Sequence, residues 1–429
     1  LAIMACVTKP EKGPNELTRA PDEAIYRMCY APVDVRSLLQ DPLERGKIRR
    51  LPASQVYFSL KELDDEEIRA LLPYVTEEQW QTILDLDLWD RDRLSVGSFL
   101  RWQRFLLGTD DAVARKLLRA TERELWELSL IRELEIYART EEDEFSGEPQ
   151  DRPAMMTPDR AFLIGLPRNA EKERLYRSLV ERLYELAPEE TMNWLAEAAF
   201  RTPSELEEEA YQNRRRRIEM LGFQDYFDAI SVYTPLTLAS RLPEKRWEPG
   251  EPDAVLPSAL RQIPRGGPML LFRALASVSD TDVLQRLVEE LFHVCNKVLI
   301  ADRTASEDPA RVKRSLRKAV TGISLGLSVW SDDRLERAES GLRRHFLVSF
   351  FQVGYGQLQE VRRQAQELAG RGFVEPGSYL EAALEGFLLR FPLLTEQGEK
   401  SFRRRFFQDQ ADLKWAYRLL EEIRAAKRG

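Results

Sequence analysis

The chain has 429 residues, enough for two or three packed domains, because a single hydrophobic core rarely grows beyond about 250 to 300 residues. The chain contains 64 Lys and Arg residues and 72 Asp and Glu residues, and the resulting net charge of −8 opposes any general affinity for nucleic-acid phosphates. Charged residues make up 32% of the chain, against roughly 25% in an average soluble protein. This composition favours solvated helices over a turn-rich β fold.

The cysteines are Cys6, Cys29 and Cys295, too few and too scattered for a disulfide framework, and no C-x-x-C occurs. We therefore predict a reducing, cytoplasmic location. Uncharged helical stretches such as 319–330, with 12 residues, are shorter than the about 20 that a membrane-spanning helix needs, so no membrane span is expected. Residues 1–6 loosely resemble the end of a lipoprotein signal, but without a basic region before them we expect an unmodified terminus.

The first part of the chain is predicted to be an N-terminal arm and helix over 1–50, followed by an array of short antiparallel helices over 51–139. Helix-start signals recur in the array every 10 to 19 residues, which predicts helices of about three turns with minimal loops. These signals are Ser54, Asp64, Thr76, Ser95, Thr109 and Thr121. No fixed period returns, so the array is not a sequence repeat.

Residues 140–157 combine acidic charge, one glycine and two prolines with little apolar content, and they predict a linker between domains. A helical domain is predicted to begin after it, with its first part over 158–242. The short apolar run at 161–166 is predicted to be one short strand, for which the sequence shows no partner.

Six prolines and three glycines fall within 243–268, which predicts a long irregular connection. The second part of the helical domain is predicted over 269–429. Its clearest helix, 281–301, has apolar residues at steps of three and four, and its last helix is predicted over 402–426. The fold class is therefore predominantly all-α, with a larger helical bundle-like domain after the array.

Ser324 lies in a formal match to the G-x-S-x-G nucleophile motif, and Asp332 and His345 follow in the order used by hydrolases of that class. The motif requires a strand before the serine, but the apolar spacing here continues a helix. We predict that Ser324 lies within a helix and that Gly322 and Gly326 allow a neighbouring helix to approach closely.

His293 and His345 are the only histidines, so imidazole chemistry has two candidates in the chain. Both are predicted to be exposed or at the border of the core. Cys295 lies on the buried stripe of the same helix as His293, on a different side, so a Cys-His dyad is not expected. We predict no catalytic residue, no metal site and no cofactor.

The densest acidic group beside apolar residues comprises Asp85, Asp87, Asp90 and Asp92. Carboxylates bind hard cations, but the glycine and glutamate of a calcium-binding EF-hand loop are absent. The segment is instead predicted to be a helix end followed by a helix start. Asp90 or Asp92 would cap the new helix, while Leu86, Leu88 and Trp89 pack inward.

The strongest basic run is 214–217, but four successive helical residues point in directions 100° apart and cannot form one basic face. Arg214 shares a side with apolar residues, so it is predicted to be partly buried and ion-paired. The carboxylates suggested for it are Glu205, Glu207, Glu208 and Glu209, acting from another element or chain. The alternative is contact with an anion or a partner through Arg214, Arg215 and Arg217.

Several stretches together resemble a family of uncharacterised bacterial proteins. They are 84–94, 221–227, 233–236, 296–302 and 343–348. The resemblance extends over most of the chain from residue 51 and implies a mostly helical fold and a bacterial origin. It implies no activity and no site residues, because the family is one of unknown function. Phe346 stands where the family pattern has proline, which leaves the helix break at that point open.

Abundant exposed helix, short loops and the lack of convergent catalytic groups favour a non-catalytic interaction or scaffold protein of the bacterial cytoplasm. Its partner would be another protein or a second copy of the chain. The alternative is an enzyme or small-ligand-binding protein with a site built from distant Asp, Glu and Arg residues. A weaker alternative is nucleic-acid binding through 214–217.

Overall fold

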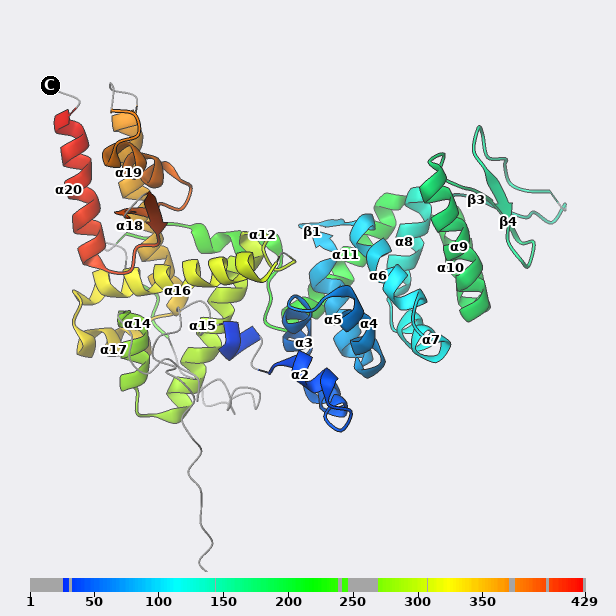
Figure 1. Ribbon diagram of the computed structural model, residues 1–429, viewed down its shortest axis with the longest axis horizontal. Coiled ribbons are helices and arrows are strands. Elements are labelled where there is room, and N and C mark those ends of the chain that lie inside the picture. The colour runs from blue at the N-terminus through cyan, green and yellow to red at the C-terminus, as the bar shows by residue number, and fades with distance from the viewer. Residues whose placement is uncertain are drawn as a thin grey trace, which may run out of the picture. The chain divides into compact units, whose positions relative to one another are not determined.

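The computed structural model describes residues 26–30, 33–142, 144–237, 241–245, 269–306, 308–369, 375–398 and 401–426. Within these residues the fold is predominantly all-α, as predicted, with only short strands (Figure 1). None of the described helices is long and apolar enough to cross a lipid bilayer. Most of the predicted irregular connection lies outside the described residues, and so does the predicted arm up to residue 25.

The described residues form two compact units. Unit 1 lies within 1–32, 230–298 and 313–429, and unit 2 lies within 33–229 and 299–312. The helices of unit 2 are α2 (Val35–Gln40), η3 (Arg45–Arg50), α3 (Ala53–Leu60), α4 (Asp65–Leu71), η4 (Leu72–Tyr74), α5 (Glu77–Asp87), α6 (Val96–Leu107), α7 (Asp111–Arg119), α8 (Arg123–Glu133), α9 (Ala170–Leu186), α10 (Pro188–Phe200), α11 (Pro203–Met220) and α12 (Tyr226–Ala229). Its strands are β1 (Trp89–Asp90), β2 (Arg93–Leu94), β3 (Glu135–Ala138), β4 (Ala154–Met156) and β5 (Phe162–Gly165).

The short helices predicted over 51–139 are present, and local capping sets several of their starts. The side chains of Asp64, Thr76 and Ser95 accept hydrogen bonds from backbone N–H groups at the starts of α4, α5 and α6, as predicted. The other three predicted caps are wrong, since Pro52, Asp110 and Glu122 precede α3, α7 and α8. The Thr121 hydroxyl instead donates to the Leu117 carbonyl at 2.9 Å and closes the preceding helix.

The strand predicted at 161–166 is β5, and it has a partner on each side. The sheet order is β3–β5–β4, with both pairs antiparallel. The two partners have only three or four residues each, too few for alternation to identify them from the sequence. The segment 140–157, for which the sequence predicts a domain boundary, lies within unit 2 and supplies β4.

Unit 1 contains most of the long helices. In chain order its elements are η2 (Tyr26–Tyr30), η5 (Ile230–Tyr233), α14 (Leu270–Ser277), α15 (Thr281–Ala301, to residue 298), α16 (Pro309–Ser331, from residue 313), α17 (Leu335–Arg344), α18 (Leu347–Ala369), α19 (Tyr379–Leu388), β6 (Leu394–Gln397), β7 (Phe402–Arg405) and α20 (Gln410–Ala426). The apolar stripe predicted for α15 is largely buried. The helix predicted over 402–426 is wrong at its start, because 402–405 pair with β6 as an antiparallel hairpin.

Glycines bring α16 and α18 into backbone contact. A Cβ atom added at Gly326 would lie 1.8 Å from the Phe350 carbonyl oxygen, and one added at Gly354 would lie 2.2 Å from the Gly322 carbonyl oxygen. This confirms the predicted close approach of a neighbouring helix. Ser324 lies inside α16, fully buried, and not on a strand-to-helix corner, so the nucleophile interpretation has no structural basis.

Candidate functional site

The acidic segment at 85–92 ends α5 and then forms a two-stranded hairpin. β1 and β2 pair antiparallel, with Arg91 and Asp92 at the turn between them. The predicted helix start capped by Asp90 or Asp92 is therefore wrong. Ser95 caps α6 instead, because its side chain accepts a hydrogen bond from the Ser98 N–H. The expected inward packing of Leu86, Leu88 and Trp89 is confirmed by their burial.

Asp85 is the buried centre of an ion-pair network that joins α5 to α11. Its carboxylate accepts two hydrogen bonds from Arg217, from Nε and Nη2, both at 2.8 Å. Its main-chain oxygen accepts a third, from Arg214 Nε, also at 2.8 Å. In the basic run it is Arg217 that forms ion pairs here, with this aspartate and with Glu122. Arg214 is buried, as predicted, but the ion pair predicted for it with a glutamate at 205–209 is wrong, because its Nε donates to a main-chain oxygen instead.

The other three aspartates of the predicted acidic group point to different partners. Asp87 accepts hydrogen bonds from Lys61 Nζ at 2.6 Å and from the Trp102 indole at 2.8 Å. Asp90 forms an ion pair with Arg303, and Asp92 is exposed at the hairpin turn. Across the described residues no set of three His, Cys, Asp or Glu side chains could hold a metal ion.

The basic run 214–217 is divided between the core and the surface. Arg214 and Arg217 face the α5 end, whereas Arg215 pairs with Glu219 at 3.0 Å and with Asp228 at 2.8 Å. Arg216 is exposed. The run therefore presents no continuous basic face.

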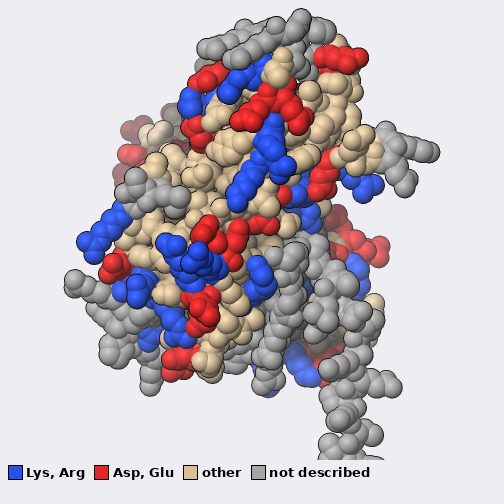
Figure 2. All heavy atoms as spheres, turned by 90° about the vertical axis from the view of Figure 1, so that its left-hand side faces the viewer, with Lys and Arg blue, Asp and Glu red and all other residues tan. Residues whose placement is uncertain are grey.

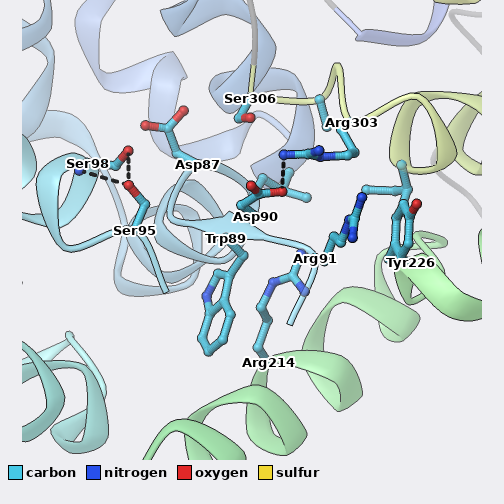
Figure 3. A pocket seen from close by; sticks show the side chains of 13 residues that line it. Asp87, Trp89, Asp90, Arg91, Ser95, Ser98, Arg214, Tyr226, Arg303 and Ser306 are labelled. Atoms are coloured by element: carbon cyan, nitrogen blue, oxygen red, sulfur yellow. Dashed lines mark hydrogen bonds and ion pairs between the residues drawn. The ribbon is translucent and has the colours of Figure 1, made fainter. Parts of the chain in front are cut away.

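A cavity of about 250 Å³ lies where these segments meet in unit 2, and we call it the arginine pocket (Figure 3). It brings together three stretches that are far apart in the chain. Its lining consists of Leu86, Asp87, Trp89, Asp90, Arg91, Ser95, Ser98, Arg214, Tyr226, Ile300, Arg303, Ala305 and Ser306. The two groups of predicted site residues thus contribute to one cavity through Asp87, Asp90 and Arg214. Asp85 does not line it but accepts a hydrogen bond from Arg214.

Two arginines of the pocket lie on aromatic rings. The Arg214 guanidinium carbon is 5.3 Å from the centroid of the Trp89 ring, and that of Arg91 is 5.2 Å from the centroid of the Tyr226 ring. A guanidinium held over a ring face keeps its in-plane N–H groups available for an oxyanion. Arg91 makes no ion pair with any described residue.

Arg214 is the most unusual charge in the pocket. The residue is only 5% exposed, and its terminal nitrogens make no hydrogen bond with the described residues, although its Nε is bonded to the Asp85 carbonyl. Burial lowers the pKa of Arg214, opposed by the charges of Asp85 and Asp225. The guanidinium remains protonated, so an additional anion beside it would stabilise its charge.

Backbone strain also occurs at this pocket. Arg91 and Arg303 have φ angles of 61° and 60°, in the left-handed region that favours glycine. Such conformations cost on the order of 1 kcal/mol each and are concentrated at functional sites.

Sequence reasoning did not identify Arg91, Tyr226 or Arg303 as site residues. A usable signal was present, because 84–94, 221–227 and 296–302, which carry the resemblance to a known family, all contribute to the pocket. Their convergence could not be seen in the sequence, since the contacts join residues more than one hundred positions apart.

The two histidines belong to unit 1, and neither is among the residues that line the pocket. His345 is buried, so the prediction that it is exposed or at the border is wrong; its Nδ1 lies 3.0 Å from the Pro243 carbonyl oxygen and its ring packs against Trp330. His293 is half-buried at the border of the core, as predicted. The break before α18 persists with Phe346 in place of proline, because His345 is extended and bridges to Glu244.

The described chain is thus a predominantly helical protein of two compact units with a small arginine-lined cavity in one of them. It belongs to the family of unknown function DUF6178, which it matches over residues 17–428, and the predicted resemblance is confirmed. Comparison with curated proteins and with solved structures found no match.

A second buried carboxylate, Glu127 in α8, predicts a pH-dependent stability. Its side chain is 0% exposed, and although Arg123 Nε lies 2.9 Å from Oε1, neither oxygen has a well-directed hydrogen bond. Burial, opposed in part by Arg123, raises the pKa of Glu127 from 4.5 to about 7. The folded state therefore binds more protons than the unfolded state between these values, and its stability falls as pH rises through that window, by about 3 kcal/mol.

We expect Glu127→Gln to remove this loss. In urea unfolding, the free energy of unfolding of the variant should exceed that of the parent by up to about 3 kcal/mol at pH 8, with little gain at pH 4.5. Glu66→Gln, at an exposed position of α4, serves as the control and should show no such pH-dependent difference. If Glu127→Gln changes the free energy of unfolding equally at both pH values, the pKa of Glu127 is not raised as described.

Proposed function

We propose that the protein binds a small ligand carrying an oxyanion group, such as a phosphate or carboxylate, in the arginine pocket. The observation that carries this proposal is the buried Arg214, whose terminal nitrogens line the cavity without a protein partner (Figure 3). Buried charges in proteins are paired or hydrogen-bonded as a rule, so this guanidinium indicates an anionic partner.

The charges around the pocket favour an anion. Asp87 is neutralised by Lys61 and Asp90 by Arg303, while the Asp85 carboxylate is engaged by Arg217. The positive charge of Arg91 is left to face the cavity, and that of Arg214 is offset only in part by the buried Asp225. The cavity volume of about 250 Å³ leaves room for a small ligand.

Among the functions expected from the sequence, the geometry favours the small-ligand alternative, with a site assembled from distant Asp and Arg residues. The described lining contains no His or Cys, so we propose binding and assign no reaction. The bacterial, cytoplasmic setting remains part of the proposal, supported by the low cysteine content and by the resemblance described above.

Nucleic-acid binding through 214–217 has little support. Arg214 is only 5% exposed and Arg217 is ion-paired with Asp85 and Glu122, so neither is presented on the surface to an extended phosphate backbone. The face of unit 1 shown in Figure 2 carries basic and acidic side chains interspersed, without a continuous basic patch. Salt-sensitive binding to a phosphate backbone requires several clustered cations.

The pocket is tested by thermal unfolding and calorimetric titration with inorganic phosphate and with succinate at constant ionic strength. A ligand at about 100 times its Kd stabilises the folded state by about 2.7 kcal/mol, so at least one probe should raise Tm. Arg91→Ala should weaken binding of that probe about tenfold or more, because it removes charge-assisted hydrogen bonds.

Arg216→Ala is the matched control, since it removes an exposed arginine close in sequence to the pocket residues but outside the lining. It should leave the response to phosphate and succinate unchanged. No stabilisation by either probe, or the same stabilisation in Arg91→Ala as in the parent, would refute the proposal.

A further inference from the structure

A second concave surface of unit 2 lies where the α9–α10 hairpin meets the turn between β4 and β5. It is an open groove of about 610 Å³. Its lining consists of Pro158, Asp159, Glu181, Tyr184, Glu185, Pro188, Glu189 and Met192, and we call it the acidic groove. None of these residues belongs to the arginine pocket.

The floor of the groove is apolar and partly open to solvent. Met192 is 40% exposed, and Pro158 and Pro188 are also exposed, while Tyr184, which also lines the groove, is buried. Exposed apolar side chains grouped in a concave surface with a polar rim are typical of protein-docking sites.

The polar lining of the groove is acidic. Asp159, Glu181, Glu185 and Glu189 contribute four carboxylates, and no Lys or Arg is among the lining residues. Glu185 pairs with Arg182 at 2.9 Å, whereas Glu181 and Glu189 form no ion pair with described residues. A groove of this charge repels anionic segments and attracts cationic ones.

The groove is also preorganised. A single residue, Ala187, joins α9 to α10, and Asp159 is held by hydrogen bonds from Thr157 at 2.5 Å and from the Tyr184 hydroxyl at 3.0 Å. Although burial acts in the opposite direction, these bonds and the Ala161 N–H hold the pKa of Asp159 below its usual range. Its negative charge is therefore permanent at neutral pH.

We propose that the acidic groove docks a segment of a partner protein in which an apolar side chain is flanked by Lys or Arg. The apolar residue would occupy the floor beside Met192, and the flanking cations would face Glu181 and Glu189. A second copy of this chain is a poorer occupant, because two molecules with a net charge of −8 repel each other. This docking role agrees with the expectation of a helical interaction protein and does not depend on the arginine pocket.

The test uses the full chain and a short fluorescent peptide with a central Leu-Phe pair flanked on both sides by lysines. Fluorescence anisotropy should show binding that weakens as salt is added. The same peptide with glutamates in place of the lysines should not bind. The double variant Glu181→Lys/Glu189→Lys should weaken binding of the lysine peptide by about tenfold or more, since it reverses the rim charge.

Glu421→Lys/Glu422→Lys is the matched control, because it changes the net charge equally at exposed positions of α20 in unit 1. If this control binds the lysine peptide as tightly as the parent does, the result supports the acidic groove as the docking site. The docking proposal is overturned if both double variants lose the same affinity for the lysine peptide, or if the parent binds the glutamate peptide as tightly as the lysine peptide. The proposal is also overturned if the parent self-associates in sedimentation and only Glu181→Lys/Glu189→Lys abolishes this association. The groove would then bind a second copy of the chain. Phosphate stabilisation of the groove variant should be retained, which separates this test from that of the pocket.

Discussion

Gly326→Ala is expected to destabilise unit 1 by about 3 kcal/mol or more, a large effect for the addition of one methyl group. The new Cβ would lie 1.8 Å from the Phe350 carbonyl oxygen, far inside van der Waals contact. The obstacle is main chain, so no side-chain rotation can relieve it and α16 and α18 must separate. The loss of their packing should appear as a lower urea midpoint in circular dichroism.

Gly97→Ala provides the control for that substitution. Gly97 also lies in a helix, α6, but a Cβ there would meet no atom within 4 Å. Because alanine favours helix by up to about 1 kcal/mol over glycine, this variant should be as stable as the parent or more stable. Similar unfolding of both variants would show that the α16–α18 contact is not as tight as described.

Asp85→Asn is expected to cost about 3 kcal/mol, because it leaves Arg217 beside a neutral amide in the interior. The Asp85 side chain is 1% exposed and engages both Nε and Nη2 of that arginine at 2.8 Å. The main-chain oxygen that accepts the hydrogen bond from Arg214 Nε is retained in this variant, so only the carboxylate charge near Arg214 is lost. Urea unfolding measures the loss of stability, and phosphate titration measures the effect on the arginine pocket.

The comparison for this prediction is Asp65→Asn, which breaks an exposed pair with Arg101 at 3.0 Å. Surface pairs of this kind contribute about 1 kcal/mol or less. Adding Arg217→Gln to Asp85→Asn should recover part of the lost stability, since the uncompensated charge is then removed as well. If Asp85→Asn is no more damaging than Asp65→Asn, the buried network does not support the fold.

The candidate site shows where inference from sequence reached its limit. The acidic segment at 85–92 and the basic run at 214–217 each stand out in the sequence, but the run is paired to Asp85 through Arg217 and not, as predicted, through Arg214. That they pair with each other was not predicted, because 132 positions separate Asp85 from Arg217. The third part of the pocket, around Arg303, follows a helix end that carries no chemical motif.

The sequence by itself determined what depends on neighbouring residues. The helical class follows from apolar spacing and from caps such as Asp64 and Thr76, because helical hydrogen bonds and capping join residues three or four positions apart. The close α16–α18 approach could be predicted because glycine spacing on one helix face is also local. Family membership followed from contiguous stretches.

Only the tertiary structure decided the features that join distant segments. These are the partners of β5, the β6–β7 hairpin, the burial of His345 and the convergence of three stretches on the arginine pocket. Strand pairing and ion pairing depend on which segments meet in space, and several partners of equal local quality exist for each residue in the sequence. The packing of the helices selects one of them.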